Sequence, residues 1–173
     1  MSQETRFLLV LFGLISFISC VHPDRVDVKS TSVGEASKER LRYLGLVCFK
    51  NHCFQVEVVS SLKEQTRGLM FRNYLDYNKG MLFFYEDEKR RGFWMKNTFI
   101  PLDIIWINQN KEVVFIHKNA KPCRGDTCKT IYPDKKAKYV LELKAAVSDD
   151  INLKVGDRLN ISIDTNHYLD SDG

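Results

Sequence analysis

The residue types best suited to chemistry are concentrated in one apolar run, RRGFWMKNTFIPLDIIWIN, which spans Arg90–Asn108. Within it, Trp94 offers apolar contact area, Lys96 can meet an anionic or carbonyl group, and Asn97 can orient a ligand through hydrogen bonds. Asp103 adds a carboxylate a few residues further on. Two interpretations follow from this spacing. These side chains line a ligand-binding site, or they form a polar clasp that holds a corner of the fold.

Asp103 must have a partner in the folded protein. It follows Pro101 and enters the segment IIWI, which is apolar on both faces of a strand and therefore belongs deep in a sheet. An isolated buried charge is too costly to keep, so the carboxylate must be paired, hydrogen-bonded or at the edge of a pocket. Lys96, across the proline bend, and Arg67, at the end of a predicted helix, are the feasible ion-pair partners.

Catalytic machinery is sparse in the sequence. Asp103 and Glu142 could act as acid and base on a glycosidic bond, but nothing in the sequence sets the distance between them. His117 is the one histidine in a predicted strand, and no nucleophile motif stands beside it. The motifs of serine hydrolases, zinc proteases and phosphate-binding loops are absent from the sequence. We therefore predict a binding or accessory domain without a cofactor, and keep an envelope glycan hydrolase as the alternative.

The cysteines predict an oxidising compartment. Once Cys20 is set aside, four remain in two equally spaced pairs, CFKNHC and CRGDTC. An even number outside the cytosol indicates disulfides, and of the three connectivities the local pairs, Cys48 with Cys53 and Cys123 with Cys128, are the simplest. A four-thiolate zinc site is the competing interpretation. Such sites favour tighter spacing and reducing compartments, so we predict no metal.

The second cysteine pair encloses Arg124, Gly125 and Asp126, which resemble the tripeptide that host integrins recognise. A ring closed by cysteines would pre-organise this tripeptide and reduce the entropy lost on binding. Because tripeptides also recur by chance, an adhesin is only a minor alternative.

The N-terminal residues indicate export. Arg6 precedes an apolar run of thirteen residues, FLLVLFGLISFIS, which is shorter than the about 20 residues of a membrane span and suits a signal peptide. The run ends at Ser19-Cys20, which resembles the site where bacterial lipoproteins are cleaved and lipidated. We therefore predict a signal peptide over 1–19, palmitate on Cys20 and a polar tether within 20–42. The protein is then anchored in the cell envelope, in the periplasm or at the outer surface.

Short alternating or apolar runs predict strands for most of the remaining chain, which has 173 residues in all, 44% of them hydrophobic and 28% charged. The segment CFQVEVV alternates, and Ser61 and Glu64 have the spacing of a helix capping box. These features favour a mainly β fold: a single small antiparallel β-sandwich or partly closed, jelly-roll-like barrel, with one short helix after the first strand. The predicted domain spans 43–166, and an acidic tail follows over 167–173. Further strands are predicted in GMLFFY, FWM, LDIIWI, EVVFIHK, KYVLEL and GDRLNISI.

Five motifs stand in an order that resembles one known family: RGLMFR, GMLFFY, FWMKNT, PLDIIWI and YVLEL. They resemble the uncharacterised bacterial and archaeal family catalogued as domain of unknown function one-nine-two, over about Phe54–Ile163. The resemblance implies one small β-rich domain, often behind a signal or lipoprotein peptide, and it implies no reaction. Motif positions of the family include Arg67, Lys96, Asn97, Asp103 and Glu142.

The net charge of +4 is modest, and basic residues cluster between positions 111 and 139. Outside the cell membrane such a cluster suits a solvated loop, lipid headgroups or cell-wall polymers. We therefore predict contact with a membrane through the lipid anchor, and with an envelope glycan, an anionic lipid or a protein through the domain. Nucleic acid is not a predicted partner. The predicted ligand-binding residues are Arg67, Trp94, Lys96, Asn97, Asp103 and Glu142.

Overall fold

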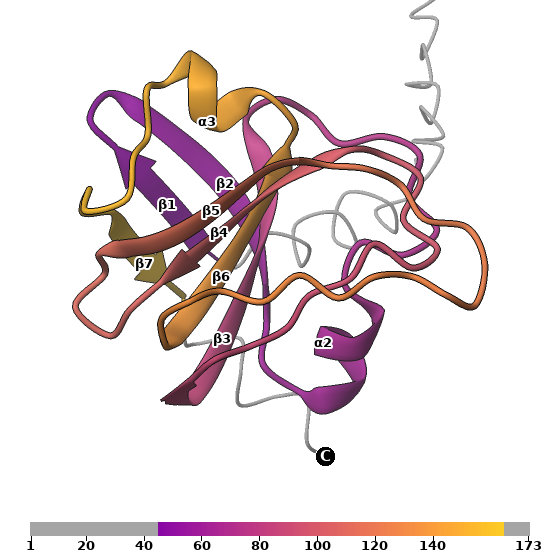
Figure 1. Ribbon diagram of the computed structural model, residues 1–173. Helices are drawn as coiled ribbons and strands as arrows, with labels where there is room; N and C mark the ends of the chain where they lie inside the picture. Colours follow the sequence, from indigo (N-terminus) through magenta and orange to yellow (C-terminus); the bar gives the residue numbers. More distant parts are fainter. Residues whose placement is uncertain (1–44, 165–173) are drawn as a thin grey trace, which may run out of the picture. The chain divides into compact units, whose positions relative to one another are not determined.

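In the computed structural model, seven strands form one sheet with the order β5-β4-β6-β3-β2-β1-β7 (Figure 1). The structure describes residues 45–164. The predicted signal peptide, the lipidated Cys20, the tether and the acidic tail lie outside the described residues. In the described part of the chain, no helix is long and apolar enough to cross a membrane. The strands are β1 (Gly45–Phe49), β2 (His52–Val59), β3 (Lys79–Lys89), β4 (Leu102–Ile107), β5 (Val113–Ala120), β6 (Ala137–Lys144) and β7 (Asn160–Ile163).

The pairing is antiparallel except between β2 and β3, which run parallel. A parallel pair needs a crossover, and the helix α2 (Leu62–Arg67) lies in it. The helix begins as the capping box predicts, because the Glu64 N–H donates to the Ser61 hydroxyl at 3.4 Å. It ends at Gly68, whose φ of 45° suits glycine. The mainly β prediction is confirmed, with some differences. The strand β1 precedes the strand predicted as first, and the helix α2 joins parallel strands. The strand predicted in FWM is not formed, because Phe93 makes only an isolated bridge with Ile131, and a second short helix occurs over Val147–Asp150.

The inner face of the curled sheet holds the first apolar core. Beyond the strand pairs, the Val113 N–H donates to the Asp157 carbonyl and the Leu159 N–H donates to the Lys111 carbonyl, which joins the start of β5 to the segment before β7. These bonds bring the two edges of the sheet together locally, although the sheet does not close into a barrel. The helix α3 (Val147–Asp150) packs on this core with β6. Strand residues of the inner core are Val47, Phe49, Phe54, Val56, Val58, Leu82, Ile105, Ile107, Val113, Leu141, Leu143 and Ile161.

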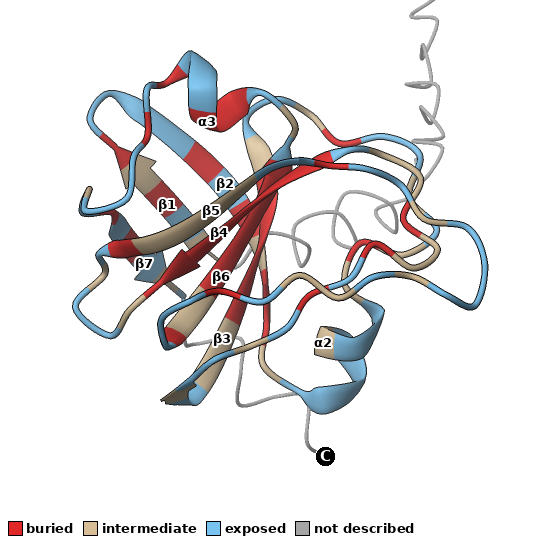
Figure 2. Ribbon diagram, in the orientation of Figure 1, coloured by how far each residue is buried: buried red, intermediate tan, exposed pale blue. Residues whose placement is uncertain are grey.

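The outer face of the central strands carries a second apolar core, which connecting segments cover. Every residue of β4 is buried as a result (Figure 2), which confirms the prediction that this strand lies deep in the sheet. The Trp106 indole N–H is satisfied as well, because it donates to the Arg91 carbonyl at 2.8 Å. Strands contribute Val59, Met81, Phe83, Leu102, Ile104, Trp106, Ala120, Ala137 and Val140, and the connections contribute Leu69, Leu75, Phe93 and Met95.

The four cysteines that were predicted to pair locally form the two predicted disulfides. Cys48 and Cys53 face each other across the β1–β2 hairpin, with an S–S distance of 2.11 Å. Cys123 and Cys128 close the loop between β5 and β6, with an S–S distance of 2.09 Å. Among the described residues, no group of three or more histidine, cysteine, aspartate or glutamate side chains is arranged to hold a metal ion.

Candidate functional site

Asp103 is a fully buried structural carboxylate on the inner face of the sheet. Its Oδ1 accepts from the Asn119 N–H at 2.9 Å. Its Oδ2 accepts from the N–H of Ser148 at 2.9 Å and from the hydroxyl of Ser148 at 2.7 Å. The carboxylate thereby ties β4 to the end of β5 and to α3. This is the clasp interpretation for Asp103, with partners that the sequence analysis missed.

Lys96 lies elsewhere and does not pair with Asp103. Its Nζ is 3.5 Å from Asp126 Oδ1 in the loop closed by the second disulfide, and 5.7 Å from the centre of the Trp94 ring. Arg67, the other predicted partner, is exposed at the end of α2. The ion pairs that the sequence allowed for Asp103 are therefore not formed, because backbone and hydroxyl donors occupy that carboxylate.

Asn97 joins three connecting segments through its backbone. Its N–H donates to the Cys123 carbonyl at 2.9 Å, and its carbonyl accepts from the Phe71 N–H at 2.7 Å. The φ of Asn97 is 54°, a left-handed conformation that asparagine tolerates better than most residues. This backbone role is enough to explain the asparagine at position 97, and no ligand has to be invoked.

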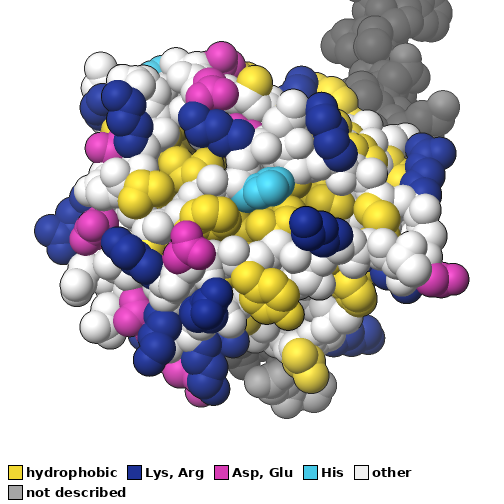
Figure 3. All heavy atoms as spheres, viewed as in Figure 1, with side chains coloured by type: hydrophobic (Ala, Val, Ile, Leu, Met, Phe, Trp, Pro, Cys, Tyr) yellow, Lys and Arg dark blue, Asp and Glu magenta, His cyan; other side chains and the backbone are white. Residues whose placement is uncertain are grey.

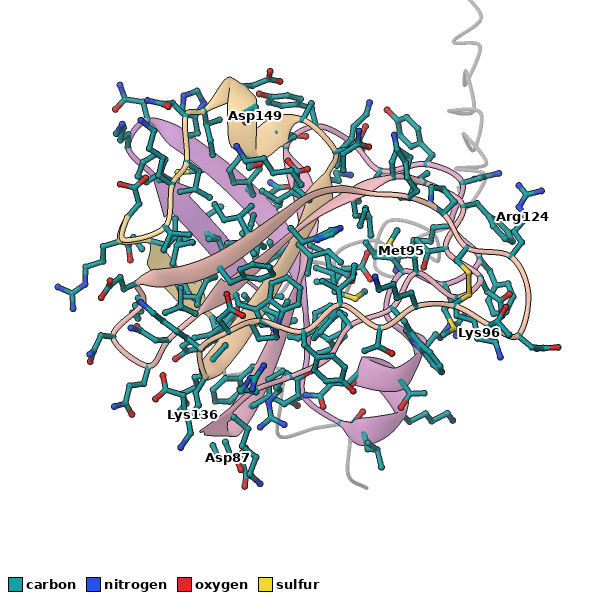
Figure 4. The ribbon with its side chains drawn as sticks, viewed as in Figure 1. Asp87, Met95, Lys96, Arg124, Lys136 and Asp149 are labelled. Carbon is teal, nitrogen blue, oxygen red and sulfur yellow. A yellow bond between two sulfur atoms is a disulfide. The ribbon has the colours of Figure 1, made fainter. Side chains whose placement is uncertain are left out.

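We call the result the loop surface, which consists of Phe71, Trp94, Lys96, Phe99 and Arg124. Phe71 meets Phe99 edge to face at 6.3 Å, and the Arg124 guanidinium lies 5.0 Å from the Phe99 ring centre. Phe71 is 62% exposed and Trp94 is 43% exposed. Figure 4 shows the labelled Lys96 and Arg124 in the loops at one side of the sheet, away from Asp149 at α3. The loop surface therefore combines exposed aromatic rings with two cations.

Both charged residues of the Arg-Gly-Asp tripeptide contact the domain. Arg124 lies over Phe99, and Asp126 is the partner of Lys96. Arg124 thus belongs to the loop surface, and Asp126, whose side chain is fully exposed, lies beside it. The side chains of the tripeptide are oriented by these neighbours as well as by the disulfide ring.

Glu142 lies on the outer face, in the second core. It stands opposite Ile104 on one side and Met81 on the other, and it is 5% exposed. Its Oε2 is buried without a hydrogen-bond partner. Burial raises the pKa of Glu142 to about 8, against the opposing effect of the nearby Arg72 guanidinium. Glu142 is therefore largely protonated at pH 7.

Arg72 reaches the same face from the segment after α2. Its two terminal nitrogens donate to the two carboxylate oxygens of Glu57 on β2, at 2.5 and 2.6 Å. The sequence analysis listed neither residue among the site candidates. The alternation of β2 indicates that Glu57 faces away from the inner core, but only the parallel pairing of β2 with β3 brings it near Glu142.

The acid–base pair of the hydrolase alternative is not assembled. Asp103 stands opposite Leu143, and Glu142 stands opposite Ile104, so the two carboxyl groups belong to neighbouring positions on paired strands. Successive side chains point to opposite faces of a sheet, which sends Asp103 inward and Glu142 outward. The two catalytic carboxyl groups of a glycosidase flank the same glycosidic bond. Asp103 and Glu142 cannot do so from opposite faces of the sheet.

A curled mixed sheet with an outer apolar layer and a loop surface defines a small, mainly β domain. The sequence model of DUF192, the domain of unknown function one-nine-two, described as "Uncharacterized ACR", matches residues 35–161. The chain belongs to this family, as the five motifs indicated.

One protein of similar sequence and two proteins of similar structure illustrate this relationship. A UPF0127 protein of Thermococcus sibiricus is 26% identical over 112 residues, which cover 64% of this chain and 68% of the relative. A provisionally assigned transcription regulator of Sinorhizobium meliloti has a similar crystal structure, with a TM-score of 0.62 and 30% identity, covering 68% of this chain and 94% of that chain. A protein of unknown function from Novosphingobium aromaticivorans has a TM-score of 0.61 and 31% identity, covering 67% and 82%.

Proposed function

We propose that this protein is an exported, lipid-anchored binding domain of the cell envelope, and that its loop surface binds an anionic envelope ligand. The observation that supports it most directly is the pairing of aromatic rings with cations on two connecting segments: Lys96 with Trp94, and Arg124 with Phe99. In Figure 3, hydrophobic side chains are exposed over the middle of the viewed face, with Lys and Arg side chains around them.

The chemistry of the loop surface favours a ligand with an anionic group beside apolar area. Aromatic rings contribute apolar contact, while the cations attract negative charge. The acidic partner of Lys96 is Asp126, with Oδ1 3.5 Å from Nζ and a fully exposed side chain. Such a pair contributes at most about 1 kcal/mol, so an incoming anion can replace Asp126 at little cost.

Export is supported by the disulfides. Both pairs formed by the described cysteines are typical of proteins outside the cytosol, where thiols are not kept reduced. The N-terminal pattern of an apolar run ending at Cys20 supports the same proposal. An oxidising compartment and an anchor together bring the domain close to envelope lipids and polymers.

The anchor is tested by labelling cells that express the full chain with palmitate. We expect label on the wild-type protein and none on Cys20→Ala, because the predicted acylation site is the thiol of Cys20. Cys20→Ala should also release the protein from the membrane fraction. Label that persists in Cys20→Ala would contradict the proposed anchor.

The loop surface is tested with the full chain carrying Cys20→Ala, which removes the lipidation site. The apolar N-terminal run is the same in every variant, so a difference between variants reports on the loop surface. Binding is measured to vesicles containing phosphatidylglycerol and, separately, to poly(glycerol phosphate). We expect Lys96→Ala to weaken binding roughly fivefold, the equivalent of about 1 kcal/mol for one cation near an anionic surface. Lys154→Ala, an exposed lysine far along the chain, serves as the matched control.

The fluorescence of the two tryptophans identifies the contact. Trp94 is 43% exposed whereas Trp106 is fully buried, so quenching by acrylamide reports mainly on Trp94. A bound ligand should protect it. A duplex DNA sample is included because one similar structure is assigned as a transcription regulator. The proposed loop-surface function would be contradicted if the protein bound neither the phosphatidylglycerol vesicles nor poly(glycerol phosphate). Equal binding by Lys96→Ala and Lys154→Ala would contradict it as well.

A further inference from the structure

We propose that Glu142 and Arg72 form a second ligand site, on the outer face of the sheet, that takes a carboxylate. This site is independent of the loop surface. The first observation is the unpartnered Oε2 of Glu142, which is buried among Met81, Ile104 and their apolar neighbours. A buried polar atom without a partner costs about 1–3 kcal/mol, so natural proteins rarely keep one that has no use.

The second observation is the Arg72 guanidinium near this carboxyl group. Its side chain is 24% exposed and is bound to Glu57, whose side chain is 14% exposed. The Arg72 guanidinium is close enough to Glu142 to influence its pKa. We place the ligand between the partly exposed Arg72 and the nearly buried Glu142. The ion pair with Glu57 orients the guanidinium before a ligand arrives.

The hydrogen-bonding groups of the site, rather than its net charge, favour a carboxylate. With Glu142 protonated, Glu57 and Arg72 balance each other, and Glu142 offers a carboxylic O–H as a donor. A carboxylate can accept this proton in a short acid–carboxylate hydrogen bond while the guanidinium stabilises its charge. A phosphate dianion would need more positive charge than one balanced arginine supplies. The apolar surroundings exclude water, which strengthens the hydrogen bond.

Several other charged or titratable groups face Glu142 or lie near it. His117 on β5 and Glu57 on β2 stand in the same row across the sheet, separated from Glu142 by Ile104 and Met81. Tyr85 on β3 interacts with Glu142 electrostatically, and burial raises the pKa of Tyr85 to about 12, so it stays neutral. The remaining groups near the row are Lys79 on β3, Lys144 on β6 and Arg72.

The test uses the full chain carrying Cys20→Ala, with acetate as the probe and with chloride and phosphate at equal ionic strength for comparison. Binding is followed through the ¹³C signal of the Glu142 carboxyl group. We expect saturable binding of acetate at about pH 6.5. Above about pH 8 the dissociation constant should rise about tenfold per pH unit, because the ligand binds the protonated form. Phosphate should leave the signal unchanged.

Two variants of Glu142 distinguish the titration of its carboxyl group from its role as a hydrogen-bond donor. Glu142→Gln keeps an N–H donor that does not titrate, so acetate binding should persist without the decline above about pH 8. Glu142→Leu should lose binding, whereas Glu86→Gln, an exposed residue of β3, should retain wild-type behaviour. N-acetylalanine serves as an additional probe that mimics a peptide C-terminus. If the natural ligand is a peptide C-terminus, the protein should bind N-acetylalanine more tightly than acetate. If the natural ligand is a small organic acid, it should not.

The proposal is overturned if acetate leaves the Glu142 signal unchanged, or if the wild-type affinity is the same at about pH 6.5 and about pH 9.5. Acetate binding by Glu142→Leu with wild-type affinity would also overturn it. If Glu142→Leu does not fold, the pH dependence of acetate affinity in wild type and in Glu142→Gln still tests the proposal. Because the loop-surface test relies on Lys96, its failure does not affect this result.

Discussion

Glu142→Gln is expected to remove a loss of stability that the wild-type protein shows between about pH 4.5 and about pH 8. Burial raises the pKa of Glu142 from 4.5 to about 8, so in this window the folded state binds a proton that the unfolded state has released. The free energy of unfolding therefore falls as the pH rises through this window, by at most about 1.4 kcal/mol per pH unit, and levels off above it.

The summed effect for wild type has an upper limit of about 5 kcal/mol across the window. Glutamine is neutral throughout, so Glu142→Gln should be more stable than wild type at about pH 8, by roughly 3 kcal/mol, and nearly equal at low pH. Urea unfolding at several pH values measures this difference. The other shifted groups do not obscure it. The pKa values of Asp76 and Asp87 lie below 3.8, and those of Tyr74, Tyr77 and Tyr85 lie above 10.

The control is Glu86→Gln, which removes an exposed carboxylate from the same sheet and should follow the wild-type profile. A wild-type protein whose stability does not decline toward about pH 8 would show that Glu142 ionises normally. A Glu142→Gln variant with the same decline would show that another group is responsible.

Asp103→Asn is expected to destabilise the domain by about 1–3 kcal/mol, the cost of leaving a buried hydrogen-bond donor without an acceptor. The carboxylate accepts from two N–H groups and one hydroxyl, and an amide can offer only one acceptor oxygen. Its NH₂ group would face either the Asn119 N–H or the Ser148 donors. At least one buried donor is then left without an acceptor.

The measurement is urea unfolding together with amide hydrogen exchange, which should accelerate at Asn119 and Ser148. Ser148→Ala is the matched variant, because it removes only the hydroxyl bond and should cost about 1 kcal/mol. Vesicle and polymer binding at the loop surface should be unaffected in both, once they are folded. Wild-type stability of Asp103→Asn would refute the clasp that the structure assigns to this carboxylate.

Local patterns were enough to predict much of the fold. The capping box at Ser61 was readable because its hydrogen bond joins residues three positions apart. The local disulfides, Cys48–Cys53 and Cys123–Cys128, were readable because each closes a short loop. The depth of β4 followed from its continuous apolar run, since a strand without a polar face must be covered on both sides.

The site depended on contacts between distant parts of the chain. Asp103 meets Ser148 across 45 residues, so the helix α3, which lies far along the chain, decides its role. Arg72 meets Glu57 across 15 residues, and Glu142 joins them only through the pairing of β3 with β2 and β6.

The sequence by itself determined most of the strands, the start of the helix α2 and the family, because periodicity and capping are properties of neighbouring residues. Only the tertiary structure decided which face each carboxyl group occupies and what it meets. The physical reason is that sheet register sets the facing side chains, and a shift of one residue would send Glu142 inward and Asp103 outward.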